Sequence, residues 1–319
     1  MGNSTSIKSL VLFHDACSDG FAAAFAAWLK LGDDAEYVPC QYGKESEHFY
    51  LLEDGSFDSD FTILNREIFI LDFSFPKWVM DGLFDLAERV TWRDHHKTAF
   101  ETFDKNPEFV WQELNCRADI LLDNNKSGAM LAWEYFHPGE EIPQLIRHID
   151  DRDRWQFKME GTKELNAALW TAPWNFQQWK ELNESDLAPM YKAGKAILRA
   201  HDQHVQSVVK GSARECWIKA PEPIDLPGSF LDEVTQGWQG LAANCPPHLT
   251  SDVGHELANQ SGTFGLCWTL GQSGTVAKCS LRSNGEYDVS AIARTFGGGG
   301  HRNAAGFEVD IQTLLGWLK

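Results

Sequence analysis

The 319-residue sequence has no apolar run of the roughly 20 residues needed to cross a bilayer. The apolar run over residues 10–13 is too short to belong to a secretory signal. Seven Cys are scattered along the chain without any CxxC pair, which argues against a disulfide framework or a structural zinc site and favours a reducing cytoplasm. The sequence also lacks a Walker motif and a dinucleotide-binding glycine loop, so these two nucleotide-binding classes are excluded.

Basic residues are scarce as well. Lys and Arg number 28 against 46 Asp and Glu, which gives a net charge of −18. Such a surface repels long polyanions, because non-specific binding to nucleic acid requires many Lys and Arg contacts to phosphate. We therefore expect no binding of long duplex DNA, and we expect a phosphate-bearing substrate to be small and held by a local cationic pocket. Apolar residues make up 43% of the chain and include 13 Trp, which suits two globular domains at this length.

Three short apolar stretches, near residues 9–13, 68–71 and 88–92, have the composition of buried strands. Each stretch leads into side chains that bind metals or phosphate. These side chains are His14, Asp19, Asp72, Asp94, His95 and His96. After the first stretch, an Ala-rich segment over residues 21–29 is typical of a helix packed closely on a sheet. Strand, polar turn and helix open an α/β sheet, so these side chains are expected where the carboxyl ends of the strands form a binding site.

Helices are predicted over the middle of the chain. Ser127 is a suitable cap for one helix, and another helix over residues 142–149 leads into an acidic segment. The spacing of apolar residues over 185–212 predicts a long helix that links two domains. Beyond it, residues 263–281 contain two β-type stretches around a Gly-rich turn, which predicts a hairpin.

Four consecutive Gly precede His301 and Arg302. Backbone N–H groups in such a run are not screened by side chains, and a helix N-terminus directly after the run would favour an anion. A flexible linker is the alternative interpretation. We predict a phosphate-binding loop that includes Gly298, Gly299, Gly300 and His301.

In their order along the chain, these motifs resemble the DHH phosphoesterase superfamily, in particular nanoRNase- or oligoribonuclease-like members with a DHH-associated C-terminal domain. The resemblance covers nearly the whole chain. The matching segments are residues 14–20, 71–72, 94–96, 149–151, 280–283 and 297–306. It implies an α/β fold in which a parallel-sheet DHH domain (1–184) is joined by a linker helix (185–212) to a smaller α/β substrate-binding domain (213–319). The active site is expected in the cleft between the domains, and a homodimer is expected only by analogy with the family.

The family resemblance also implies a metal centre, usually with one or two Mn²⁺ ions, and Mg²⁺ or Co²⁺ as alternatives. The implied metal ligands are His14, Asp19, Asp72, His95 and Asp151, with Asp72 shared between two ions and Asp150 as the alternative to Asp151. The implied catalytic residues are Asp94, His95 and His96. In this scheme His96 contacts the scissile phosphate and Asp94 orients the His pair. Arg282, the glycine loop and His301 would bind a second phosphate or a terminal nucleotide.

Cys17 departs from the family pattern, which has Asp at this position of the first motif. A thiolate favours softer ions than Mn²⁺. The first metal position is therefore expected to be weaker, to hold another ion, or to be completed by Asp15.

Together, these features predict a metal-dependent phosphodiesterase that hydrolyses short linear oligonucleotides, such as 5′-phosphorylated dinucleotides including linear diguanylate, to mononucleotides. Cyclic-dinucleotide phosphodiesterase, 3′-phosphoadenosine 5′-phosphate phosphatase and exopolyphosphatase are alternatives that share the metal centre. A nucleotide-sensing protein with an inactive metal centre is the non-enzyme alternative. No membrane partner is expected.

Overall fold

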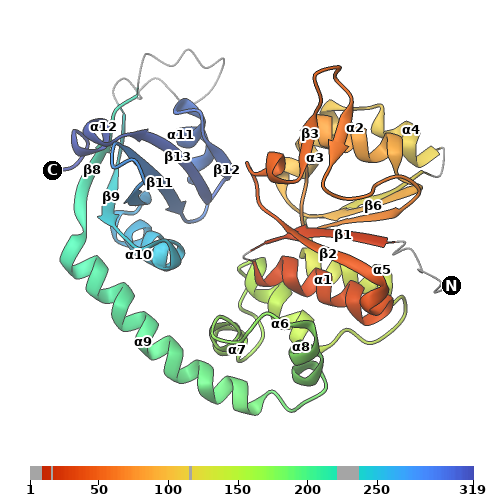
Figure 1. Cartoon of the computed structure of the whole chain (residues 1–319). Helices are drawn as coiled ribbons and strands as arrows, with labels where there is room; N and C mark the ends of the chain where they lie inside the picture. The colour runs from red at the N-terminus through yellow and green to blue at the C-terminus, as the bar shows by residue number, and fades with distance from the viewer. Residues whose placement is uncertain (1–8, 16, 115–116, 221–236) are drawn as a thin grey trace. The chain divides into compact units, whose positions relative to one another are not determined.

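The computed structural model describes residues 9–15, 17–114, 117–220 and 237–319 (Figure 1). Contacts within the chain divide it into two compact units, Met1–Leu198 and Arg199–Lys319. The division falls inside the long helix α9 (Ala188–Ser212), which lies where the sequence predicted a linker helix. Each unit contains its own sheet, so the predicted combination of a parallel-sheet domain and a smaller α/β domain is confirmed.

The first unit is built on a sheet of five strands that all run parallel. In the order in which they pair, these strands are β2 (Ala35–Cys40), β1 (Ser9–His14), β5 (Glu67–Leu71), β6 (Arg89–Asp94) and β7 (Ala118–Leu122). Neighbouring residues such as Leu10, Val11 and Leu12 are all fully buried, because helices cover both faces of the sheet. This two-sided burial explains why the central strands are continuous apolar runs.

Two layers of helices cover this sheet (Figure 1). One face packs against α1 (Ser18–Leu31), α5 (Gly128–Phe136), α6 (Gln144–Asp153), α7 (Thr162–Leu169) and α8 (Phe176–Asn183). The other face packs against α2 (Lys77–Leu86), α3 (Lys97–Lys105) and α4 (Phe109–Leu114). Smaller elements of this unit are the hairpin of β3 (Phe49–Leu51) and β4 (Phe57–Ser59) and the 3₁₀ turns η1 (Gly32–Asp34) and η2 (Glu45–Glu47).

The strand order places a topological switch point between β1 and β5. From β1 the chain moves outward to β2, and it then returns to pair β5 with the other side of β1. In open α/β sheets, ligands bind outside the carboxyl ends of the strands at such a point. Here the ends of β1, β5 and β6 deliver His14, Asp72 and Asp94.

The second unit contains a six-stranded mixed sheet, in which only β9 and β10 pair in parallel. In pairing order the strands are β12 (Gly299–His301), β13 (Ala304–Asp310), β11 (Val276–Ser283), β10 (Phe264–Leu270), β9 (Trp238–Asn244) and β8 (Arg214–Ile218). The predicted hairpin is confirmed as β10 and β11. Other elements are η3 (Pro247–Leu249), α10 (Thr250–Ser261), α11 (Val289–Thr295) and α12 (Ile311–Leu315).

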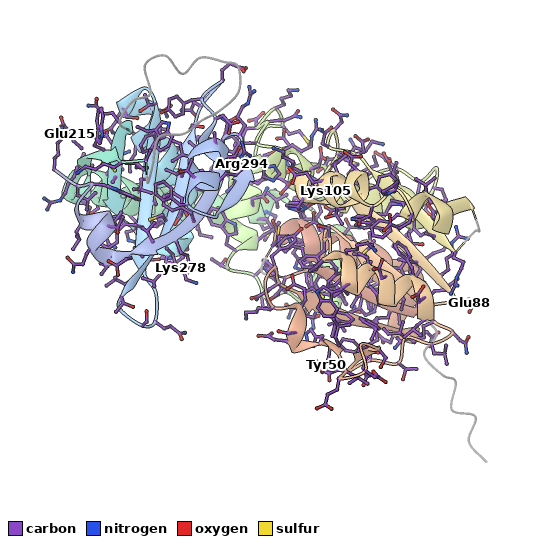
Figure 2. All side chains as sticks on the ribbon, turned by 90° about the horizontal axis from the view of Figure 1, so that it is seen from above. Tyr50, Glu88, Lys105, Glu215, Lys278 and Arg294 are labelled. Carbon is purple, nitrogen blue, oxygen red and sulfur yellow. The ribbon has the colours of Figure 1, made fainter. Side chains whose placement is uncertain are left out.

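Helices lie on both faces of this second sheet. Buried residues of α10 and α9 pack on one face, and buried residues of α11 and α12 pack on the other. Charged side chains such as Lys278 and Glu215 project away from the sheet (Figure 2). Across the ranges that the structure describes, no helix is both long enough and apolar enough to pass through a membrane.

Candidate metal centre

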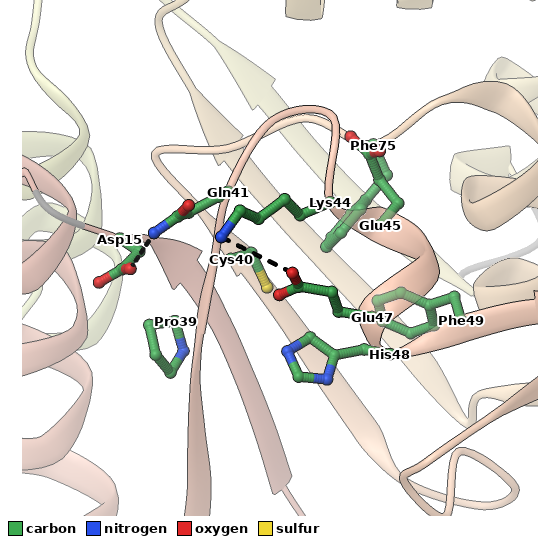
Figure 3. A pocket seen from close by; sticks show the side chains of 10 residues that line it. All are labelled: Asp15, Pro39, Cys40, Gln41, Lys44, Glu45, Glu47, His48, Phe49 and Phe75. Carbon is green, nitrogen blue, oxygen red and sulfur yellow. Dashed lines mark hydrogen bonds and ion pairs between the residues drawn. The ribbon is translucent and has the colours of Figure 1, made fainter. Parts of the chain in front are cut away.

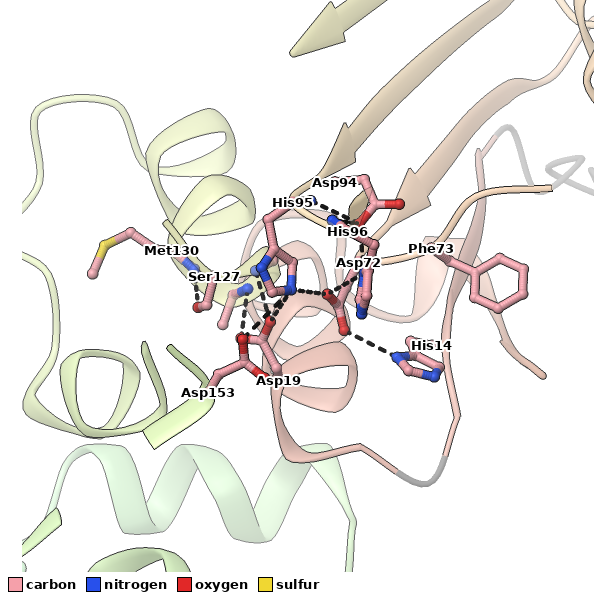
Figure 4. Close-up of polar contacts among 12 residues, drawn as sticks. His14, Asp19, Asp72, Phe73, Asp94, His95, His96, Ser127, Met130 and Asp153 are labelled. Atoms are coloured by element: carbon pink, nitrogen blue, oxygen red, sulfur yellow. Dashed lines mark hydrogen bonds and ion pairs between the residues drawn. The ribbon is translucent and has the colours of Figure 1, made fainter. Parts of the chain in front are cut away.

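Four of the five predicted metal ligands meet at the carboxyl ends of β1, β5 and β6 (Figure 4). These four are His14, Asp19, Asp72 and His95. Asp72 lies between the two His: its Oδ2 is 3.4 Å from Nδ1 of His14, and its Oδ1 is 3.0 Å from Nε2 of His95. One carboxylate therefore presents a separate oxygen to each side of the site, which is the geometry expected of a ligand shared between two ions.

The donor atoms form three groups, two of which include Asp72. One of these two contains Asp72, Asp94, His95 and His96. His14, Cys17 and Asp72 make a sulfur-containing donor group. Asp19, His95 and Asp153 make an oxygen-rich donor group, which Asp72 Oδ1 also faces. Within each of these triads the donor atoms lie within 4.8 Å of one another.

Asp72 is held in an unusual backbone conformation. Its φ is 55°, a left-handed value that is uncommon for residues other than Gly. The Asp72 N–H donates to the Arg93 carbonyl at 2.8 Å, and a Cβ on Gly128 would lie only 2.3 Å from the Asp72 Cβ. Gly128 is therefore required for the approach of α5 to this carboxylate. Backbone strain of this kind is concentrated at functional sites.

Asp19 is oriented by the start of a helix. Its two oxygens accept hydrogen bonds from the N–H groups of Gly128 and Ala129, at 2.7 and 3.0 Å. These N–H groups belong to the first turn of α5, which favours a negative charge. Asp19 Oδ2 also lies 3.6 Å from Nε2 of His95. The first turn of α5 thus aims one carboxylate into the site.

Asp94 fixes the position of His96. Its Oδ1 accepts the backbone N–H groups of His95 and His96 at 2.7 and 3.1 Å, and it lies 2.8 Å from Nδ1 of His96. The Asp94 carboxylate is fully buried. This geometry agrees with the orienting role implied for Asp94, while the contact of His96 with a phosphate stays a prediction.

Asp151 does not join the cluster, and this corrects the sequence expectation. Its Oδ1 accepts the N–H of Lys158 at 2.8 Å, and its Oδ2 accepts the N–H of Met159 at 3.0 Å and the Thr162 hydroxyl at 2.6 Å. Both oxygens are thus used to hold the segment that follows α6. Asp150, the alternative ligand, accepts the Ser127 N–H at 2.8 Å and also lies outside the donor groups.

Asp153 occupies the position expected for Asp151. Its Oδ2 lies 3.5 Å from Nε2 of His95. The helix was predicted to end at residue 149, but α6 continues to Asp153. On an α-helix, residues two apart point about 200° away from each other, so Asp151 and Asp153 face opposite sides. Recognising that the helix continues through the acidic segment would have identified Asp153.

The cluster suits a cation. Its buried atoms include Nδ1 of His14, Nε2 of His95 and both Asp72 oxygens, and none of these has a properly aligned hydrogen-bond partner among the described residues. Buried polar atoms normally have such partners. A divalent ion would satisfy these facing nitrogen and oxygen atoms.

The pKa values show the same excess of negative charge. Burial, followed by the charges of Asp72 and Asp153, raises the pKa of Asp19 well above its ordinary value. Burial also raises the pKa of Asp153. Burial alone would raise the pKa of Asp72, but the facing imidazoles of His14 and His95 outweigh it and hold that pKa low. Carboxylates crowded in this way require positive charge nearby, which a metal ion supplies.

Asp15 does not complete the first metal position, contrary to one of the three alternatives. Its Oδ2 accepts a hydrogen bond from Nε2 of Gln41 at 2.6 Å. Asp15 instead lines a hollow of about 230 Å³ together with Cys40, Gln41 and Lys44 (Figure 3). Cys17 remains the donor beside His14.

Tyr42 is a candidate functional residue that was not predicted from the sequence. Its ring stacks on Phe73 with centroids 4.3 Å apart, and it meets the rings of His14 and His96 edge-on at 5.4 and 6.1 Å. Tyr42 is 42% exposed. Tyr42 lies just after the end of β2, a strand that was not predicted. Tyr42 thus offers an accessible aromatic surface at the edge of the metal centre.

In the second unit, the sheet register brings two predicted substrate-binding residues together. Arg282 on β11 lies opposite Ala304 on β13, and Ala304 lies opposite His301 on β12. Directly opposed residues project from the same face of a sheet. Arg282 Nη2 donates to the Ser251 hydroxyl at 3.2 Å, which fixes the guanidinium beside α10.

The glycine run differs from its expected structure. A helix N-terminus does not follow it. Instead, the run begins just after the end of α11 and continues into the edge strand β12. Gly298 N–H donates to the Ala293 carbonyl, and a Cβ on Gly298 or Gly300 would collide with the backbone of β13. A Cβ on Gly299 would meet no described atom within 4 Å. The fold therefore requires Gly298 and Gly300, but it does not require Gly299.

Residues 255–315 match the family model of the DHHA1 domain. The chain carries a DHHA1 domain. The predicted DHH-associated C-terminal domain is thereby confirmed for residues 255–315. The DHHA1 domain begins in α10 and ends in α12, so it includes Arg282, the glycine run and His301.

Two further proteins resemble the DHHA1-containing chain. It is 29% identical over 310 residues to "Uncharacterized protein R106" of Acanthamoeba polyphaga mimivirus. The alignment covers 93% of this chain and 66% of the relative. The chain therefore spans slightly less than two thirds of that relative's length. A solved structure titled as the pGpG-specific phosphodiesterase PggH from Vibrio cholerae aligns with 95% of this chain and 94% of its own, at 13% identity and a TM-score of 0.45.

Proposed function

We propose that this protein is a metal-dependent phosphodiesterase that hydrolyses short linear oligonucleotides, such as 5′-phosphorylated dinucleotides, to mononucleotides. The observation that carries the proposal is the division of Asp72 between two donor groups at the switch point of the sheet. Paired cations at such a centre lower the pKa of water and neutralise charge on a phosphate.

The protein's own residues have separate tasks in this proposal. His14, Cys17 and Asp72 would hold one cation, and the oxygen-rich donor group, with Asp72 beside it, would hold a second. Carboxylate and imidazole donors favour Mn²⁺ at the second position, with Mg²⁺ or Co²⁺ as alternatives. Asp94 orients His96, which we place against a non-bridging oxygen of the scissile phosphate.

Charge supports a short substrate. The net charge of −18 opposes a long polyanion. In the DHHA1 domain, Arg282 and His301 project from one face of the sheet and supply donors for a second phosphate or a terminal nucleotide. We also propose a reducing cytoplasm as the compartment, since the described Cys residues are free thiols.

The test is hydrolysis by the full chain with Mn²⁺ and a panel of substrates. The panel contains a 5′-phosphorylated dinucleotide, a five-nucleotide RNA, a cyclic dinucleotide, 3′-phosphoadenosine 5′-phosphate and polyphosphate. We expect preferential cleavage of the linear dinucleotide and loss of activity in His95→Ala. Preference for another member of the panel would reject the substrate, and full activity of His95→Ala would reject the metal centre.

A nucleotide sensor is the second candidate, because Cys17 departs from the family's ligand pattern at the first metal position. A sensor would bind one panel member without turning it over. Binding by calorimetry together with no hydrolysis at any Mn²⁺ concentration would favour this alternative.

A further inference from the structure

The sulfur-containing donor group differs chemically from its neighbour. We propose that His14, Cys17 and Asp72 form a site for a borderline cation of the Zn²⁺ class, while the oxygen-rich donor group takes a harder ion such as Mn²⁺. The protein would then hold two unlike metals on the two sides of Asp72. This inference rests on the metal centre proposed above and specifies what each half of it binds.

The position of Cys17 supports direct ligation. Its sulfur belongs to a triad whose donor atoms lie within 4.8 Å of one another. The other two members face each other at 3.4 Å: Nδ1 of His14 and Oδ2 of Asp72 are buried, and neither has an aligned hydrogen-bond partner in the described ranges. Asp72 is fully buried. A thiol that served only as packing would not require two such donors to face it.

The donor types decide the class of ion. Thiolate and imidazole ligands select Zn²⁺ and similar borderline ions, whereas carboxylates and water suit Mn²⁺ and Mg²⁺. Three protein ligands also match the number found in catalytic zinc sites, which keep a further position open. On binding, the Cys17 thiol loses its proton to solvent and the thiolate becomes the ligand. The oxygen-rich donor group has no sulfur and so lacks this preference.

Cobalt tests the sulfur ligand directly. Co²⁺ added to the metal-free full chain should produce a thiolate-to-cobalt charge-transfer band in the near ultraviolet. The band should disappear in Cys17→Ser and Cys17→Asp and should remain in Cys40→Ala, which removes the thiol of the neighbouring hollow. A band that is absent from the wild type, or that persists in Cys17→Ser, would overturn the proposal.

Metal content provides a second measurement. The full chain is loaded with one equivalent of Zn²⁺ in an excess of Mn²⁺, dialysed, and analysed for both elements. We expect about one zinc and one manganese per wild-type chain, and at least roughly tenfold weaker zinc retention in Cys17→Asp. Equal zinc retention by the two proteins would contradict the proposal.

Hydrolysis measured on the same samples separates this inference from the proposed function. Turnover without a cobalt–thiolate band would leave the phosphodiesterase intact and reject the zinc-class site. A band that depends on Cys17, without turnover of any panel substrate, would support the site and reject the phosphodiesterase.

Discussion

Asp151 and Asp153 lie on the same last turn of α6, yet only Asp153 approaches His95. Asp153 Oδ2 is 3.5 Å from the His95 Nε2, while both Asp151 oxygens accept hydrogen bonds from the segment after the helix. One residue therefore completes the candidate metal centre, and the other stabilises the chain beside it.

This pair provides a matched test of the metal centre. Asp153→Asn should lower kcat/KM by roughly 100-fold or more, because it removes a charged donor from the reaction site, and it should leave the melting temperature of the metal-free protein nearly unchanged. Asp151→Asn should instead lower the free energy of unfolding by about 1–3 kcal/mol, since it disturbs a buried acceptor of three hydrogen bonds. Chemical denaturation and steady-state kinetics measure the two effects. The reverse pattern would restore Asp151 as the ligand.

Asp72→Asn should abolish stabilisation by metal. A ligand at 100 times its dissociation constant stabilises a folded protein by about 2.7 kcal/mol. We expect a rise in melting temperature of the wild type with Mn²⁺, reversed by chelator, and almost none in the variant. Asn tolerates the left-handed φ of 55° at this position, so the backbone should be retained. Asp58→Asn, on the exposed surface of β4, is the control that should keep the full response.

The parts of the site that could be predicted from sequence are those at the ends of buried strands. The apolar runs of β1, β5 and β6 have few other interpretations, and they deliver His14, Asp72 and Asp94 directly. Asp153 could not be placed, because the orientation of an acidic residue near a helix end depends on where the helix stops.

The other differences between the sequence-based predictions and the structure also have physical causes. Tyr42 was missed because β2 contains Pro39 and alternates less clearly than the central strands. The prediction that the glycine run forms an anion-binding loop assumed that a helix begins directly after the run. The choice between a helix and the edge strand β12 is made by pairing with β13, which local sequence does not reveal.

Stability should depend on pH through His148, which lies away from the metal centre. The Thr162 hydroxyl donates to Asp151, so His148 must donate to that hydroxyl from Nδ1, at 2.8 Å. Nε2 of His148 then accepts a hydrogen bond from the Tyr191 hydroxyl, also at 2.8 Å. Burial lowers the pKa of His148 below its ordinary value, although Asp151 opposes the shift. The unfolded chain therefore binds a proton more readily than the folded chain below about pH 6.5.

The contribution of His148 to the free energy of unfolding should consequently be fully present above about pH 6.5. Below that pH the free energy of unfolding should fall, by up to about 1.4 kcal/mol per pH unit for one proton. In His148→Gln this component should be lost, so the difference between wild type and variant should shrink from pH ~7.5 to ~5.5. Urea denaturation of metal-free protein at each pH measures it. The assignment would be contradicted if the free energies of unfolding of the wild type and His148→Gln had the same pH dependence. It would also be contradicted if His204→Gln, at an exposed position, altered the pH dependence as much as His148→Gln.

Gly299→Ala tests substrate binding by the glycine run without disturbing the fold. A Cβ at this exposed position meets no described atom, so the melting temperature should be unchanged. If the backbone of β12 contacts the substrate closely, the methyl group should raise KM for the dinucleotide roughly tenfold, a loss of about 1.4 kcal/mol. Gly211→Ala, which also adds a Cβ without a clash in the described chain, should leave KM unchanged. Identical KM values for the two variants would exclude β12 from the binding surface.

Tyr42→Ala should weaken substrate binding more than it slows the chemical step. The ring is exposed, stacks on the buried Phe73 and lies at the edge of His14 and His96, so a base or sugar next to the scissile phosphate can pack against it. Stacking of one base on an aromatic side chain contributes about 1–3 kcal/mol, which predicts a KM increase of roughly tenfold with a much smaller change in kcat. Tyr42→Phe should restore KM, because it keeps the ring and removes only the hydroxyl. A large loss of kcat in Tyr42→Ala with unchanged KM would instead mean that the ring positions the two His side chains.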